Sequence, residues 1–202
     1  GLSAPGISPY SALHKLGDPT LNFLLLPDLP TNLCSSIYVA PGEAHNKLSA
    51  TFSGPGGTMN LVDFNVGATN PFVRSSGMIV TTYWQVTEPT TQPFQILFLL
   101  TGSDGKEYLA STDVPQLFWC QTNTWKPGSL VALTSRVFTL TSSNVPPGIA
   151  HLAVAIVPLV QSSDKIMDMQ ARLSLRVGNA PDTGTPTQSM NALQLQPINI
   201  IL

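Results

Sequence analysis

Short apolar or alternating runs, each ended within a few residues by Gly or Pro, recur along this 202-residue chain and limit it to short extended elements. No segment of helical length carries the i, i+3, i+4, i+7 apolar pattern of an amphipathic helix. The runs are instead rich in β-branched and aromatic residues, which favour strands. Strands are expected over 36–40, 47–52, 58–66, 78–86, 92–101, 107–110, 117–121, 130–141, 151–160 and 167–177, with one helical turn over 70–76. Eight to ten short strands in one domain predict an all-β fold, which we expect to be an eight-stranded antiparallel jelly-roll sandwich.

The expected sandwich occupies the middle of the chain, with an extended segment at each end. Residues 1–35 hold prolines at positions 5, 9, 19, 27 and 30, too many for a helix or a central strand, and predict an N-terminal extended arm. Residues 36–180 contain the expected strands and form the jelly-roll domain. Residues 181–202 are again rich in Pro and poor in charge, which predicts a C-terminal extended tail.

The charge content is low for a protein surface. Charged residues make up 10% of the chain, whereas about 25% is typical, and the net charge is −2. Hydrophobic residues make up 43%, which argues against a disordered chain. The cations are scattered singly, so a strong electrostatic grip on nucleic acid is not expected. No apolar run approaches the roughly 20 residues needed to span a membrane. A surface with so little charge indicates extensive contact with other protein.

The two cysteines, Cys34 and Cys120, are too few to form a disulfide framework for a domain of this size. Two free thiols in a reducing compartment is the interpretation that we favour. A single disulfide between them is the alternative.

Catalytic motifs are weak. Asp182-Thr183-Gly184 matches the Asp-Thr-Gly of aspartic proteases, but those enzymes need two such carboxylates, and this copy lies between prolines, where it reads as a turn. A dimeric protease that relies on Asp182 remains a rival hypothesis. His14, His45 and His151 are far apart and lack partners at metal-ligand spacing. A Cys120–His151 nucleophile and base pair has no local signature. We therefore expect no enzyme and no catalytic, cofactor-binding or metal-binding residues.

Three tryptophans provide one alternative to a purely structural role. Trp84, Trp119 and Trp125, together with Tyr83, Phe118 and Tyr108, could form a platform on which a sugar stacks. Large aromatic residues more often fill cores and protein interfaces. The alternative function is a secreted or surface β-sandwich binding module of the carbohydrate type.

Several segments in a fixed order carry a resemblance to a known family. These segments are 59–62, then 70–80 with its Asn70-Pro71 start, the strand-like 92–99, the final strand-like 169–179, and the tail 196–200. Together they resemble the small coat proteins of plant picorna-like viruses, the comovirus and fabavirus group. An N-terminal Gly1 is similar to the product side of a viral polyprotein cleavage.

This resemblance implies a structural capsid subunit that assembles with a larger coat protein and with copies of itself. The product is an icosahedral virion that encloses an RNA genome and is assembled in the host cytoplasm. Contact with the RNA would be weak or indirect, and neither a membrane nor a cofactor would be involved.

Overall fold

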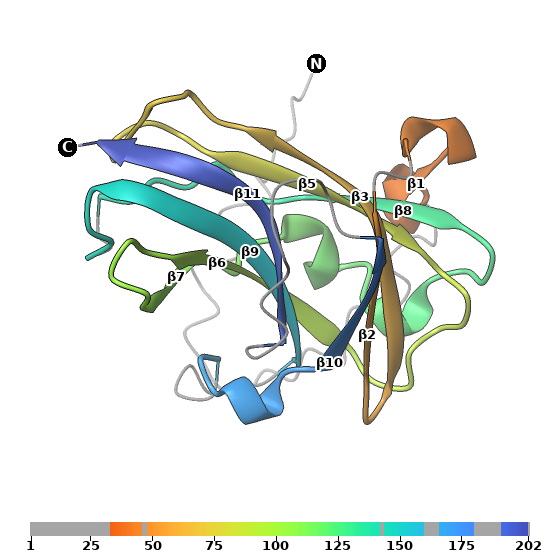
Figure 1. The fold of residues 1–202 in the computed structure, drawn as a ribbon. Coiled ribbons are helices and arrows are strands. Elements are labelled where there is room, and N and C mark those ends of the chain that lie inside the picture. The colour runs from red at the N-terminus through yellow and green to blue at the C-terminus, as the bar shows by residue number, and fades with distance from the viewer. Residues whose placement is uncertain (1–32, 46–47, 142–143, 160–165, 180–190, 202) are drawn as a thin grey trace, which may run out of the picture. The chain divides into compact units, whose positions relative to one another are not determined.

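Two β-sheets lie face to face (Figure 1), and apolar side chains from both form the core between them. The computed structural model describes residues 33–45, 48–141, 144–159, 166–179 and 191–201, all of which belong to one compact unit, Asn32–Leu202. The expected all-β sandwich is confirmed. The described residues form eleven strands, however, where eight were predicted.

The first sheet has six strands in the order β1-β8-β5-β3-β2-β10. Their bounds are Tyr38–Val39 (β1), Ser49–Gly54 (β2), Gly57–Gly67 (β3), Ile79–Gln85 (β5), Leu130–Thr134 (β8) and Ser174–Asn179 (β10). All pairs in this sheet are antiparallel.

The second sheet has five strands in the order β4-β11-β9-β6-β7. Their bounds are Phe72–Val73 (β4), Phe94–Thr101 (β6), Glu107–Ser111 (β7), Gly148–Pro158 (β9) and Ala192–Ile201 (β11). The short pair β4–β11 is parallel and the others are antiparallel. Short 3-10 helices lie in the connections, at Leu33–Ile37 (η2), Pro41–Glu43 (η3), Pro115–Phe118 (η4), Thr122–Thr124 (η5) and Met169–Ala171 (η7).

The two sheets differ in how their outer faces are used. In β5 of the first sheet every second side chain is buried, so this strand has one face in the core. Its Trp84 is fully buried, with its ring centroid 6.0 Å from that of Phe52 on β2. In β6 and β9 of the second sheet, consecutive residues are buried, which requires cover on both faces. The buried outer-face residues are Leu97, Leu99, Ala153, Ala155, Val157 and Ala192, with Ile166 packed against them.

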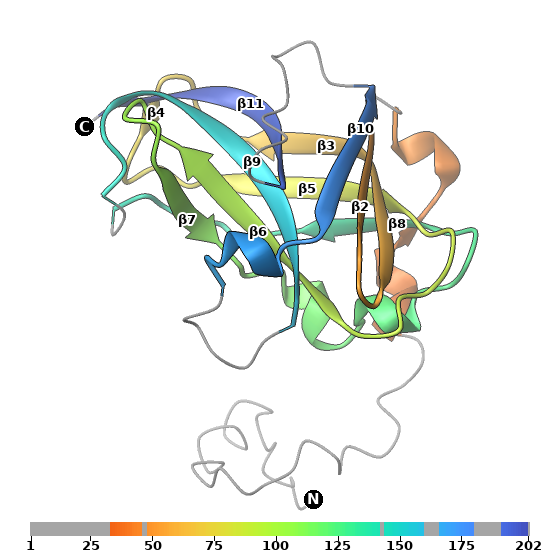
Figure 2. The same ribbon diagram turned by 60° about the horizontal axis from the view of Figure 1, so that its bottom comes forward.

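The prediction of an extended C-terminal tail is wrong for the residues of β11. Residues 192–201 are not an extended tail but a strand between β4 and β9 (Figure 2). Its core-facing side chains are Leu193, Leu195, Ile198 and Ile200, which are buried and follow a period of two except across the register shift near Gln196. The β-sandwich therefore reaches residue 201, not 180.

Three local predictions also differ from the structure. Residues 117–121 are not a strand: residues 117 and 118 are the end of the helix η4, and residues 119–121 follow it without regular structure. Residues 70–76 do not form the expected helical turn. They contain a cis Asn70-Pro71 bond followed by the short strand β4. The strand expected over 130–141 ends at Thr134. Of the predicted N-terminal arm, residues 1–32 lie outside the described part, and residues 33–35 belong to η2.

The β6–β7 hairpin carries one polar contact with electrostatic consequences. The Tyr108 hydroxyl donates a hydrogen bond of 2.7 Å to the Asp104 carboxylate. This bond lowers the pKa of Asp104 below its usual range and raises the pKa of Tyr108 above its own. The two groups therefore bond most strongly between these two pKa values, where the carboxyl is ionised and the phenol is protonated.

Replacing Tyr108 by Phe is expected to raise the pKa of Asp104, because the donor to the carboxylate is lost. A depressed carboxyl pKa adds stability above the pKa of the unfolded chain, and this contribution is lost as the pH falls through the folded pKa. The stability difference between the wild type and Tyr108→Phe should therefore shrink under acid. An NMR titration of the Asp104 carboxyl measures the shift, and an unchanged pKa in the variant would contradict the contact.

Candidate functional site

The most exposed aromatic residues of the described chain lie side by side in the connection between β7 and β8. Phe118 is 73% exposed and Trp119 is 44% exposed. We call these two residues the aromatic surface. Exposed neighbouring aromatic side chains are typical of contact surfaces, since they offer a large area to a partner at little cost in conformational entropy.

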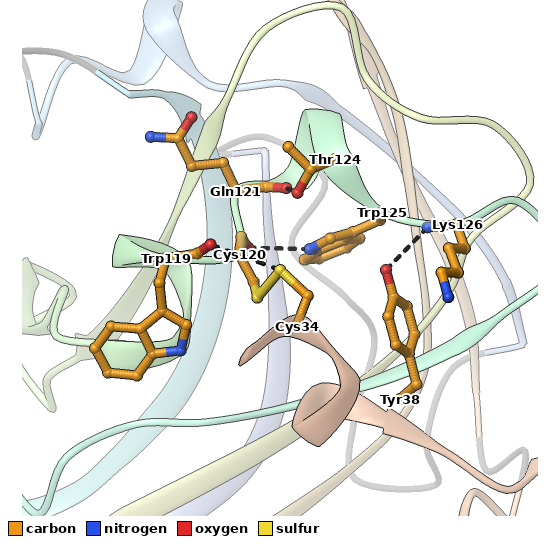
Figure 3. The surroundings of a disulfide bond; sticks show 8 residues. All are labelled: Cys34, Tyr38, Trp119, Cys120, Gln121, Thr124, Trp125 and Lys126. Atoms are coloured by element: carbon orange, nitrogen blue, oxygen red, sulfur yellow. Dashed lines mark hydrogen bonds between the residues drawn. A yellow bond between two sulfur atoms is a disulfide. The ribbon is translucent and has the colours of Figure 1, made fainter. Parts of the chain in front are cut away.

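A disulfide holds the aromatic surface in place. Cys120, directly after Trp119, is bonded to Cys34 of η2, with the two Cα atoms 5.3 Å apart (Figure 3). The Cys34 sulfur also lies 3.6 Å from the Trp119 carbonyl oxygen. Because this sulfur is bonded to another and has no proton, we regard this approach as a packing contact. The expectation of two free thiols is wrong: 86 residues separate the cysteines in sequence, but the fold places them together.

Buried residues on both sides of the aromatic surface anchor the same connection. The Trp125 indole is buried and donates a hydrogen bond of 3.1 Å to the Cys120 carbonyl oxygen (Figure 3). The buried Thr122 hydroxyl accepts from the backbone N–H of Phe94 at 3.0 Å. Phe118 and Trp119 are thus presented on a backbone that is fixed at several points.

A 3-10 helix explains why two consecutive aromatic residues face outward. In the strand expected over 117–121, Phe118 and Trp119 would point to opposite sides. In a 3-10 helix, residues three apart share a face. Leu117 of η4 packs partly against the core, and Val114 and Cys120, which lie three residues to either side of it just outside the helix, are buried. This spacing of three was present in the sequence and is the signal that was missed.

The three tryptophans do not form a platform. Trp84 and Trp125 are buried and only Trp119 is exposed, so a sugar-stacking site made of all three is wrong. An exposed aromatic pair exists instead, made of Trp119 and Phe118. It contains no titratable group, so it offers binding and not acid–base chemistry.

The candidate catalytic and metal residues are not assembled in the described part of the chain. His45 lies between η3 and β2, and His151 lies half-buried on β9. His14 and Asp182 lie outside the described residues. Within the described residues, no group of three or more His, Cys, Asp or Glu is placed to hold a metal ion. Cys120 carries a disulfide, so in this state it has no thiol to pair with His151.

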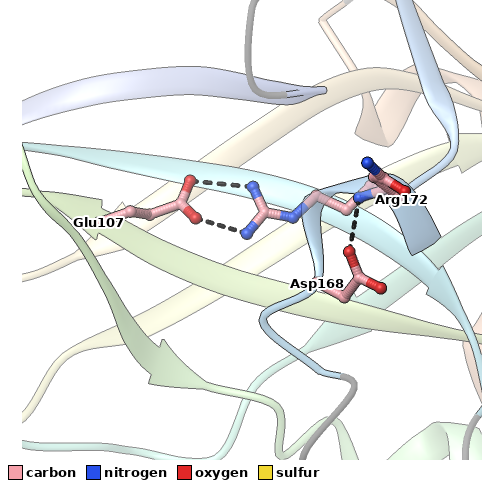
Figure 4. Close-up of polar contacts among 4 residues, drawn as sticks. Glu107, Asp168 and Arg172 are labelled. Atoms are coloured by element: carbon pink, nitrogen blue, oxygen red, sulfur yellow. Dashed lines mark hydrogen bonds and ion pairs between the residues drawn. The ribbon is translucent and has the colours of Figure 1, made fainter.

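One buried ion pair lies at the outer face of the second sheet. The Arg172 guanidinium, at the end of η7, donates two hydrogen bonds to the two oxygens of Glu107 on β7, one of them at 2.9 Å (Figure 4). The Arg172 side chain is 0% exposed and that of Glu107 is 11% exposed. Asp168 caps η7 by accepting from the backbone N–H of Gln170 at 2.9 Å. The pair fastens the segment before β10 to the sheet, and we assign it a structural role.

Replacing Glu107 by Gln is expected to destabilise the fold by about 3 kcal/mol, because a buried guanidinium would then face a neutral amide. This value is at the low end for buried pairs because Glu107 is partly exposed. Asp113→Asn provides the matched control, since it breaks the exposed Arg136–Asp113 pair and should cost less than about 1 kcal/mol. Urea unfolding measures both variants, and equal losses would show that burial of the Arg172 pair does not matter.

The described residues include no helix that is long and apolar enough to cross a membrane. Comparison of the chain with protein-family models, with curated proteins and with solved structures gives no match.

Proposed function

We propose that this chain is a structural coat protein, a subunit that assembles with a larger coat protein and with copies of itself into an icosahedral virion around an RNA genome. The observation that carries the proposal is the low charge of a β-sandwich whose surface is otherwise polar or apolar: 10% of residues are charged. Stable contact with several neighbours favours such a surface, because each buried charge costs free energy of desolvation.

We also propose that the sandwich is of the jelly-roll kind. Support comes from the path of the chain, which crosses between the sheets at successive connections. From β5 in the first sheet it passes to β6 and β7 in the second, to β8 in the first, to β9 in the second, to β10 in the first and to β11 in the second. Repeated crossing of this kind is typical of Greek-key sandwiches. The connections from β1 to β2 and from β2 to β3, which stay within the first sheet, and the β6–β7 hairpin, which stays within the second, depart from that pattern.

A second candidate is a secreted or surface β-sandwich binding module, and the Cys34–Cys120 disulfide favours it. Disulfides persist in oxidising compartments and are rare in the cytosol, where a coat protein of this kind would assemble. In this candidate the aromatic surface is the binding site, and Trp119 stacks on a sugar. A coat protein accommodates the same disulfide if it forms after the shell leaves the reducing cytosol.

The particle size of the native material tests both candidates. Sedimentation and negative-stain microscopy should show uniform shells that contain this chain beside a larger coat protein. A monomer that forms no shell with any partner would reject the coat-protein proposal. The second candidate then requires that a glycan change the fluorescence of Trp119 and that Trp119→Ala abolish its binding, whereas a Val137→Ala control retains it.

A further inference from the structure

The Cys34–Cys120 disulfide joins two segments that the fold holds by different means (Figure 3). Cys120 lies in the connection between η4 and η5. Its backbone N–H donates to the Gln116 carbonyl oxygen at 2.9 Å, and its carbonyl oxygen accepts from the Trp125 indole at 3.1 Å. Neither hydrogen bond involves the sulfur, so both remain when the disulfide is broken. The Cys120 side of the bond is therefore fixed by the fold itself.

On the Cys34 side of the bond, burial in the core begins three residues further along the chain. Cys34 lies near the start of η2, and the next two residues, Ser35 and Ser36, have exposed side chains. Ile37 at the end of η2 is buried in the core, and β1, which follows at once, pairs with β8. The disulfide thus anchors the start of η2, and Ile37 anchors its end.

The two sulfur atoms differ in their access to solvent. Cys120 is fully buried, whereas Cys34 is only partly buried. A reducing thiolate must reach the sulfur that it attacks, so Cys34 is the point at which reduction begins. Exposed disulfides are in general more easily reduced than buried ones. The fold therefore leaves this bond open to reduction from the η2 side.

We propose that this disulfide is a redox-sensitive clasp: its reduction by a dithiol releases the start of η2 from the connection that carries the aromatic surface, while the sandwich stays folded. The three residues from Cys34 to the Ile37 anchor allow a displacement of ~10 Å. In place of the covalent bond, the reduced Cys34 has a weak S–H donor contact to the Trp119 carbonyl oxygen, 3.6 Å away. Release of η2 uncovers the thiol of Cys120.

Reduction of the clasp takes two thiol–disulfide exchange steps. One thiolate of the dithiol attacks the Cys34 sulfur and forms a mixed disulfide. The bond to Cys120 breaks with its electron pair on the Cys120 sulfur, which takes up a proton from solvent. The second thiolate then attacks the dithiol's own sulfur in the mixed disulfide, and the Cys34 thiolate leaves and is protonated. The protein disulfide is reduced to two thiols, and the dithiol is oxidised to a cyclic disulfide.

Alkylation of a single buried thiol tests the release of η2. Cys34→Ala leaves Cys120 as the one thiol of the chain. The unfolded fraction of this variant, taken from its own urea transition, sets the rate at which iodoacetamide would reach Cys120 through global unfolding alone. We expect a reaction faster than this rate on the order of tenfold or more, because local opening costs less free energy than unfolding.

A buried thiol elsewhere in the core provides the matched control. Val154→Cys in the Cys34→Ala/Cys120→Ala background also carries one thiol, at a fully buried position of β9. It should react no faster than the global unfolding of that chain allows. A Cys120 thiol that is no more reactive than this standard would overturn the clasp.

Reduction of the native wild type tests the site of attack and the survival of the fold. Glutathione, a monothiol, should form its mixed disulfide on Cys34, as mapped by mass spectrometry after acid quenching. Dithiothreitol should reduce the bond without urea, and the reduced chain should keep a cooperative urea transition at a lower midpoint. A glutathione adduct on Cys120, a bond that resists dithiothreitol or a reduced chain without a cooperative transition would each overturn the clasp.

The clasp is a property of the single chain and does not rest on the proposed function. Material that forms no shells would reject the coat-protein proposal and leave the clasp standing.

Discussion

A chain truncated after Asn191 is expected to remain unfolded, because it lacks β11. Four side chains of β11 are buried in the core: Leu193, Leu195, Ile198 and Ile200. Burying each such side chain stabilises a fold by ~1.5–3 kcal/mol. Their joint loss, on the order of 6–12 kcal/mol, is comparable to the whole stability of a domain, about 5–15 kcal/mol. Circular dichroism and urea unfolding should show no cooperative transition in the truncated chain.

Two point variants within β11 test whether the packing of its side chains in the core, and not only the presence of the strand, stabilises the fold. Leu195→Ala should cost about 2–5 kcal/mol, because it opens a cavity in the core. Asn199→Ala, on the exposed side of the same strand, should change the stability by less than about 0.5 kcal/mol. A truncated chain with a wild-type urea midpoint would show that β11 is dispensable, as an extended tail would be.

Removal of the disulfide is expected to give the next largest loss of stability. The bond joins Cys34 and Cys120 across a sequence separation of 86 residues. In the chain-entropy treatment, a cross-link over a loop of this length stabilises the fold by about 4–5 kcal/mol, because it restricts the unfolded chain. The Cys34→Ala/Cys120→Ala variant should lose this amount in urea unfolding, and reduction of the wild type should reproduce the loss.

The double variant has no disulfide, so it controls for any effect of the reductant other than reduction of this bond. Dithiothreitol should lower the urea midpoint of the wild type and leave that of Cys34→Ala/Cys120→Ala unchanged. Thiol titration of the native, unreduced protein should find no free cysteine. Two reactive thiols in freshly prepared native material would contradict the pairing and would support the reducing compartment that the sequence suggested.

The hairpins could be predicted from the sequence because their signals are local. Gly56 and Gly57 have positive φ angles, 97° and 135°, and lie at the turn where Gly54 pairs with Gly57. Glycine adopts such angles without the steric penalty of a Cβ atom. The segment Gly102–Gly105 likewise connects β6 to β7, and its Gly-Ser-Asp-Gly sequence is typical of a hairpin turn.

The strand β11 was missed because Pro197 weakens the local signal for a strand. Proline lacks an N–H group and is normally confined to strands with an unpaired side or to irregular positions. Near Pro197, β11 has both an unpaired side and an irregular position. The only described β4 pairs are with Ile200 and Ile201, and the β9–β11 register shifts between Gln194 and Gln196. Neither the neighbours of a strand nor a bulge is visible in the composition of the segment.

By itself, the sequence determined the all-β class, the turns with glycine and the low charge, since each depends on residue type or on neighbours within a few positions. Only the tertiary structure decided that Cys34 meets Cys120, that Phe118 and Trp119 are exposed together, and that residues 192–201 form the strand β11. These features join residues far apart along the chain or depend on whether a segment becomes a strand or a 3-10 helix. The packing of the two sheets sets both, and local preferences do not encode it.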